Sequence, residues 1–133
     1  MNEPFFVLES PRCFTDTCAA LEQAVPAHGF GLIGSHNLGD ILRSKGLSFS
    51  EECRVFEVCQ PQQAARVLGA AMLLSTALPC RISVFTEAGR TTVAMVRPEG
   101  MLLMLSHDPD LVAVAGEVEA STIAIIREAV GQP

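Results

Sequence analysis

The segment that decides the fold is residues 54–86, RVFEVCQPQQAARVLGAAMLLSTALPCRISVFT. It predicts a strand over residues 54–59, a helix over 61–76 and a second strand over 81–86. Pro61 lies at the first position of the helix, where a missing backbone N–H costs least. A helix that directly follows one strand and leads into another indicates a fold that mixes both kinds of element.

Apolar periodicity and the positions of proline and glycine predict the other elements on either side of this segment. On the N-terminal side we expect a strand at 5–9, a helix that is capped by Thr15 or Asp16 and stops at Gly29, a strand at 30–35 and a helix at 38–45. On the C-terminal side we expect a strand at 91–96 that forms a hairpin with 81–86, a helix at 98–105, and a long helix capped by Asp108 that begins at Pro109. The mixed order predicts one α+β domain over residues 1–133.

Composition limits the class of protein. The chain has 133 residues, of which 49% are hydrophobic, so it is long enough and apolar enough to bury a core. No apolar run approaches the roughly 20 residues that a membrane span needs. The N-terminus lacks the basic region of a signal peptide, so we expect a cytoplasmic protein. Its large apolar fraction favours a partner subunit that covers part of the surface.

Charge argues against polyanionic partners. The net charge is −6, and the nine basic residues are scattered singly along the chain. Because binding to phosphates needs a clustered positive surface, we expect neither nucleic acid nor an anionic membrane as a partner. The five cysteines are an odd number without the dense spacing of a secreted disulfide scaffold, so we expect reduced thiols.

Neither the glycine pattern of residues 29–34 nor the spacing of the histidines indicates a binding site. Residues 29–34, GFGLIG, match the dinucleotide fingerprint in letters, but here the glycines follow a helix and enter a strand, the reverse of the order that binds pyrophosphate. We expect His28 in the last turn of a helix and both His36 and His107 in loops. The histidines lack the spacing of a helical metal pair and no CxxC motif occurs, so no metal motif is assigned.

Cys59 is the stronger candidate among the thiols. It ends a predicted strand just before a helix N-terminus, where the helix dipole and free amides favour a thiolate that acts as a nucleophile or a metal ligand. Glu57 lies on the same strand face and would be a neighbouring ligand or base. The alternative is a small thiol packed under the start of the helix. Cys80 lies on the same face of its predicted strand as the apolar residues Ile82 and Val84, which favours a thiol that is packed in the core.

Whether Cys59 and Cys80 meet depends on strand direction. If the intervening helix crosses between parallel strands, the two thiols lie at opposite ends of strands roughly 17 to 20 Å long. That is far beyond the ~7 Å between Cα atoms at which a disulfide becomes impossible. If the strands are antiparallel, or if the second thiol comes from a partner subunit, a shared site becomes possible. Arg81, on the other face from Cys80, either binds an anion or pairs with Glu57, and we favour the ion pair.

Two phrases carry a family resemblance: Glu57-Val58-Cys59-Gln60-Pro61 and Leu78-Pro79-Cys80-Arg81. They resemble the domain of unknown function 302 (DUF302) family, which typically reads Glu-x-Cys-Asn-Pro and then Leu-Pro-Cys-Arg, and the resemblance extends over most of the chain. Gln60 departs from the usual Asn, which is the stronger helix cap. The resemblance implies a compact α+β fold similar to that of the TATA-binding protein, often as a homodimer, and it implies no reaction.

We therefore expect a cytoplasmic binding or interaction domain that forms a homodimer. Its ligand site would lie at Glu57, Cys59, Cys80 and Arg81, and its ligand would be a small molecule or a soft metal ion, which thiolates favour. The sequence leaves any cofactor unknown. One alternative is a thiol-dependent enzyme, redox or nucleophilic, that uses Cys59, and it ranks second because no histidine is well placed as a base. Another is a purely structural dimer module.

Overall fold

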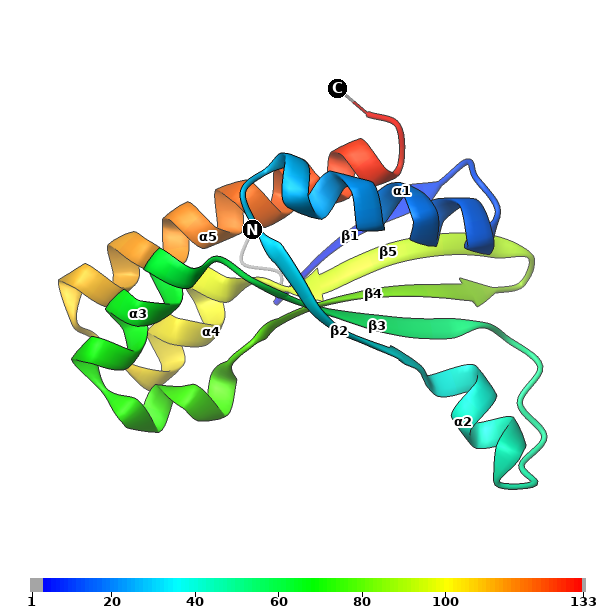
Figure 1. Ribbon diagram of the computed structural model, residues 1–133, viewed down its shortest axis with the longest axis horizontal. Helices are drawn as coiled ribbons and strands as arrows, with labels where there is room; N and C mark the ends of the chain where they lie inside the picture. Colours follow the sequence, from blue (N-terminus) through cyan, green and yellow to red (C-terminus); the bar gives the residue numbers. More distant parts are fainter. Residues whose placement is uncertain (1–3, 133) are drawn as a thin grey trace.

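A computed structural model describes residues 4–132, and these residues form one antiparallel sheet with helices (Figure 1). The strands lie in the order β1-β5-β4-β3-β2, and each neighbouring pair is antiparallel. Their bounds are β1 (Phe5–Ser10), β2 (Gly31–Asn37), β3 (Cys53–Cys59), β4 (Cys80–Glu87) and β5 (Arg90–Val96). The strands agree with the predicted positions to within two residues at each end, and the predicted α+β class is confirmed. The likeness to the TATA-binding protein stays a prediction.

The helices agree with the predictions except in one place. They are α1 (Phe14–Ala27), α2 (Leu38–Ser44), α3 (Pro61–Ala70), the short 3₁₀ helix η1 (Met72–Ala77), α4 (Pro98–Leu105) and α5 (Pro109–Ala129). The predicted single helix over 61–76 is wrong, because α3 ends at Ala70 and Ala71 is extended, with φ −160°. Gly69 lowers helix propensity just before this break, and η1 then turns the chain back toward the sheet.

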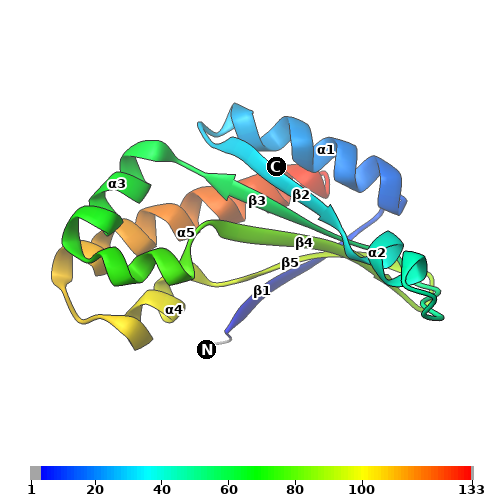
Figure 2. The same ribbon diagram turned by 60° about the horizontal axis from the view of Figure 1, so that its bottom comes forward.

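The main core lies between the sheet and two helices. Figure 1 and Figure 2 show α1 and α5 lying across the same face of the sheet. The fully buried side chains on this face come from both layers and include Leu21, Phe56, Ile82, Val93 and Ile125. Alternate residues of the strands point to the other face, where Phe5, Val7 and Val96 are about half exposed.

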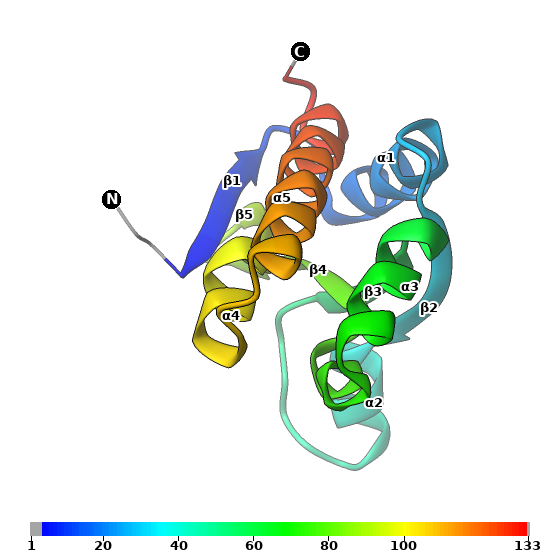
Figure 3. The ribbon, with the colours of Figure 1, turned by 90° about the vertical axis from the view of Figure 1, so that its left-hand side faces the viewer.

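A second apolar cluster lies beyond the end of the sheet. Val67 of α3, Leu74 of η1, Leu102 of α4, and Leu111 and Val114 of α5 are buried together there. Seen from this end in Figure 3, α3 and α4 lie on opposite sides of the first turns of α5. This cluster covers the positions where β3 ends and β4 begins.

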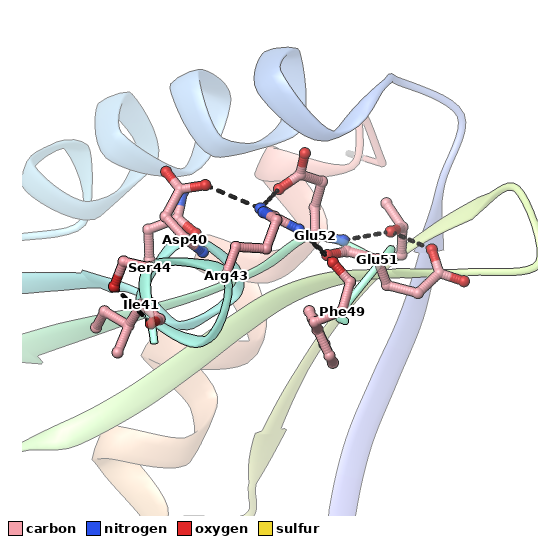
Figure 4. Close-up of polar contacts among 9 residues, drawn as sticks. Asp40, Ile41, Arg43, Ser44, Phe49, Glu51 and Glu52 are labelled. Carbon is pink, nitrogen blue, oxygen red and sulfur yellow. Dashed lines mark hydrogen bonds and ion pairs between the residues drawn. The ribbon is translucent and has the colours of Figure 1, made fainter. Parts of the chain in front are cut away.

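At the opposite end of the sheet, Arg43 holds the loop between α2 and β3 (Figure 4). Its Nη1 atom donates to the carbonyl oxygens of Phe49 and Glu51 at 2.8 and 3.0 Å, and its Nη2 atom donates to carboxylate oxygens of Asp40 and Glu52. The hydrogen bond to Asp40 is the main reason why the pKa of Arg43 is raised. This loop therefore returns to the sheet in a fixed path.

Within residues 4–132, no helix is both long and apolar enough to cross a bilayer.

Candidate functional site

The two cysteines of the motif lie at the same end of the sheet. Strands β3 and β4 are antiparallel neighbours, with Val58 directly opposite Cys80 and Glu57 directly opposite Arg81. The last residue of β3, Cys59, is thus one position away from the first residue of β4. Of the two topologies left open by the sequence, the structure has the antiparallel one, because α3 and η1 turn the chain back instead of crossing over the sheet.

Cys59 and Cys80 both line a cavity of about 340 Å³ at this end of the molecule, which we call the main cavity. Its lining residues come from the start of β2, the ends of β3 and β4, from α3 and η1, and from α4 and α5. Most of the lining side chains are apolar, including Phe30, Val67, Leu68, Pro98, Met101 and Leu102. Among the described residues that line it, none carries a formal charge.

A few polar groups interrupt the apolar wall of the main cavity. Besides the two thiols they are the side chains of Gln60, Gln63 and Ser75. The Oε1 atom of Gln60 accepts a hydrogen bond from the backbone N–H of Gln63 at 2.7 Å, so glutamine does cap α3 in place of the family's asparagine. The Oε1 atom of Gln63 is itself buried and has no hydrogen-bond partner among residues 4–132. Such an atom is rare in folded proteins, because an unsatisfied buried acceptor is costly.

Burial controls the chemistry of Cys80. Desolvation raises the pKa of this thiol from 9.0 to about 11, and the neighbouring Cys59 raises it further, while the charge of Arg81 lowers it. Cys80 is therefore a neutral thiol at physiological pH.

Glu57 and Arg81 form a separate cluster on the face of the sheet that α1 and α5 do not cover. Arg81 Nε lies 3.8 Å from Glu57 Oε2, as expected for the ion pair that the sequence favours. The other carboxylate oxygen of Glu57 lies 3.0 Å from Nε2 of His36. A Cβ atom at position 34 would collide with this carboxylate, so Gly34 leaves the space that Glu57 occupies.

The placement of His36 corrects the sequence analysis. We expected this histidine in a loop, but it lies in β2, which continues to Asn37. The irregularity in pairing between Leu32 and Gly34 shifts the register of β2 against β3, which interrupts the alternation by which strands are recognised. Sequence reasoning therefore missed His36 as a neighbour of Glu57.

The four predicted site residues divide into two pairs. Cys59 and Cys80 line the main cavity, whereas Glu57 and Arg81 are not among the residues that line it. Arg81 lines a smaller cavity of about 110 Å³, together with Cys80 and Met101. In the part of the chain that the structure describes, no group of three or more His, Cys, Asp or Glu residues converges as metal ligands do.

Comparisons with known proteins agree with the motif. The model of the family described as "Domain of unknown function DUF302" matches residues 6–129. A similar solved structure is that of an uncharacterized conserved DUF302 protein from Bacillus stearothermophilus. It is 31% identical, its TM-score is 0.89, and the match covers 95% of this chain and 98% of that one. No protein with a curated function matches the chain. The chain belongs to the DUF302 family.

Proposed function

We propose that this protein is a binding domain for an uncharged, mainly apolar small molecule, which it holds in the main cavity. The observation that carries the proposal is a cavity of about 340 Å³ whose described lining has no charged residue. This volume lies at the lower end of the range for small-molecule sites, which are mostly apolar with a few placed polar groups. A charged ligand would lose its hydration there without gaining a counter-ion.

Gln63 defines the polar part of the ligand. Its buried Oε1 atom has no partner among the described residues, and the side chain belongs to the lining of the main cavity. A ligand N–H or O–H group would satisfy this acceptor. The ligand class is therefore an apolar body that carries one hydrogen-bond donor.

The thiol-dependent enzyme ranks below binding. A nucleophilic or redox thiol needs thiolate character, and burial keeps Cys80 protonated by raising its pKa to about 11. The described lining of the main cavity offers Cys59 no histidine or carboxylate as a base. The homodimer and the cytoplasmic location belong to the proposal as the setting in which the binding domain works, and the half-exposed Phe5, Val7 and Val96 support a covered sheet face.

The test uses N-phenyl-1-naphthylamine, a neutral naphthalene with one N–H group, whose fluorescence rises in an apolar site. Ala64 lines the main cavity, whereas its neighbour Ala65 on α3 is exposed and does not line it. We expect saturable binding to the unaltered protein, and we expect Ala64→Phe to weaken it by about tenfold or more, which is about 1.4 kcal/mol. The matched variant Ala65→Phe adds the same ring to the surface and should bind as the unaltered protein does.

Circular dichroism and size-exclusion chromatography establish that both variants fold. Equal binding by folded Ala64→Phe and Ala65→Phe would refute the proposal, as would the absence of saturable binding to the unaltered protein. Gln63→Leu provides a second measurement, because it removes the acceptor and keeps the apolar volume. It should weaken the naphthylamine more than naphthalene itself, which has no N–H group.

A further inference from the structure

We propose that Met101 sets the length of the ligand that the main cavity accepts, and that this ligand is elongated, with its hydrogen-bond donor at one end and an alkyl tail at the other. The inference rests on the proposed function, because it concerns the same cavity, and it adds which part of the ligand lies where. It is carried by the smaller cavity of about 110 Å³, since five of the ten residues that line it also line the main cavity.

The two cavities follow one another along β4. Cys80, the first residue of this strand, lines both of them, whereas Ile82, two residues further along and on the same strand face, lines only the smaller one. Ile82 and Thr122 of α5 are fully buried and both line the smaller cavity, so this space extends from the end of the sheet toward the core. A ligand that outgrows the main cavity therefore has a second space beside it.

Met101 is the adaptable part of the partition between the two cavities. Of the residues that line both cavities, only Met101 has a long side chain, and methionine is unbranched and flexible. It lies one turn after Pro98 on α4, so the same face of this helix covers both cavities. The shared residues are Ala77, Pro79, Cys80, Pro98 and Met101. Truncation of Met101 should therefore join the two spaces.

Gln63 and Met101 define the two ends of the ligand. Gln63 belongs to α3 and Met101 to α4, and these helices lie on opposite sides of the first turns of α5 (Figure 3). The unpartnered Oε1 atom of Gln63 accepts the ligand's hydrogen bond at the α3 side. The rest of the molecule then crosses the main cavity toward α4, where Met101 stops it.

The smaller cavity suits an alkyl tail. Ile82 and Met95 contribute apolar side chains to it. The hydroxyl group of Thr122 already donates to backbone carbonyl oxygens of its own helix. Arg81 also lines this cavity, but its Nε atom lies 3.8 Å from Glu57 on the uncovered face of the sheet. These polar groups are engaged elsewhere, so a tail that fills the space buries apolar surface and breaks no hydrogen bond.

The test is a series of 4-n-alkylphenols, from ethyl to octyl, that displace N-phenyl-1-naphthylamine. Each phenol is uncharged at neutral pH and has one O–H donor, so only the tail varies. In the unaltered protein, affinity should rise by about fourfold per methylene group and level off once the tail reaches Met101. In Met101→Ala the rise should continue over about two more methylene groups, so the octyl member should bind about tenfold or more tightly than it binds the unaltered protein. The ethyl member should bind both proteins equally.

Two variants are matched to Met101→Ala. Met101→Leu conserves the side-chain volume and therefore the partition, and Met104→Ala makes the same truncation at an 87% exposed position of the same helix. Both should level off at the same tail length as the unaltered protein. Gln63→Leu should weaken every phenol by the same factor, because all of them share the donor end. If circular dichroism shows that Met101→Ala does not fold, Met101→Val truncates the side chain less and should shift the levelling-off in the same direction.

Levelling-off at the same tail length in Met101→Ala and Met101→Leu would overturn the role of Met101, and so would a rise that continues unbroken in the unaltered protein. In both cases the phenols still bind, so the proposed function stands. If neither the dye nor any phenol binds saturably, the proposed function is refuted, and this inference falls with it.

Discussion

Glu57 of β3 lies directly opposite Arg81 of β4, and their side chains meet on the face of the sheet that the helices leave uncovered, with Oε2 and Nε 3.8 Å apart. The same carboxylate also contacts His36 of β2, so three neighbouring strands meet at Glu57. Arg81 is 57% exposed at its side chain, so water screens much of this attraction.

We therefore expect a small coupling between Glu57 and Arg81. In a double-mutant cycle with Glu57→Gln and Arg81→Met, the interaction energy from urea unfolding should be at most about 1 kcal/mol, as for other exposed pairs. A clearly larger coupling would mean that the pair is shielded from solvent, for example by a partner subunit on this face. Repeating the cycle at high salt distinguishes these cases, because exposed pairs are screened.

The pKa of Cys80 predicts how stability depends on pH. The pKa is about 11 in the folded chain and 9.0 as a reference value for the unfolded chain, so the folded state holds its proton more tightly. This stabilisation is fully present below pH 9 and is lost as the pH rises toward 11. Cys18, whose pKa burial also raises to about 11, adds to the same slope.

Urea unfolding at a series of pH values tests this dependence. The free energy of unfolding should fall between pH 9 and 11, and Cys80→Ala should make the fall shallower. Iodoacetamide should also label Cys13 well before Cys80 at neutral pH. An unchanged slope in Cys80→Ala would show that this thiol titrates normally in the folded chain.

The hydrogen bonds of Arg43 should stabilise the loop between α2 and β3 at the far end of the sheet. Arg43→Met removes the donors that hold the carbonyl oxygens of Phe49 and Glu51, so amide hydrogen exchange over residues 46–52 should become faster. Exchange in α5 should stay the same. Lys45→Met, an exposed neighbour just after α2, is the control, and faster exchange in both variants would deny Arg43 this specific role.

Substitution by alanine should have opposite effects on stability at two glycines. Gly69 is helical and exposed, and no atom lies within 4 Å of an added Cβ, so Gly69→Ala should stabilise the protein by about 0.5–1 kcal/mol. Gly89 turns the β4–β5 hairpin at φ +79°, so Gly89→Ala should destabilise it by about 1–2 kcal/mol. Thermal unfolding of the two variants checks both signs, and a destabilised Gly69→Ala would mean that the break after α3 depends on that glycine.

Local signals in the sequence were enough to predict the positions of most helices and strands and to predict which strand residues share a face. Proline at a first helical position predicted the starts of α3, α4 and α5, and alternation placed Glu57 on the same strand face as Cys59, opposite the face on which Phe56 and Val58 are buried. The order and direction of strands are set by pairing between distant segments, so the sequence left open whether Cys59 and Cys80 meet. Nothing in the sequence indicated that Met101 lines the main cavity, because a methionine in an apolar helix is typical of an ordinary core.

The strand order also sets when the chain can finish folding during synthesis. Within the described sheet β1 pairs only with β5, with Phe5 opposite Val96, so the first strand of this sheet to be made must wait for the last one before it has a neighbour. The helix that closes the core over both, α5, is translated later still. Until then the apolar side of β1 has no cover, and a nascent chain is exposed to aggregation through a strand that leaves the ribosome well before its partner.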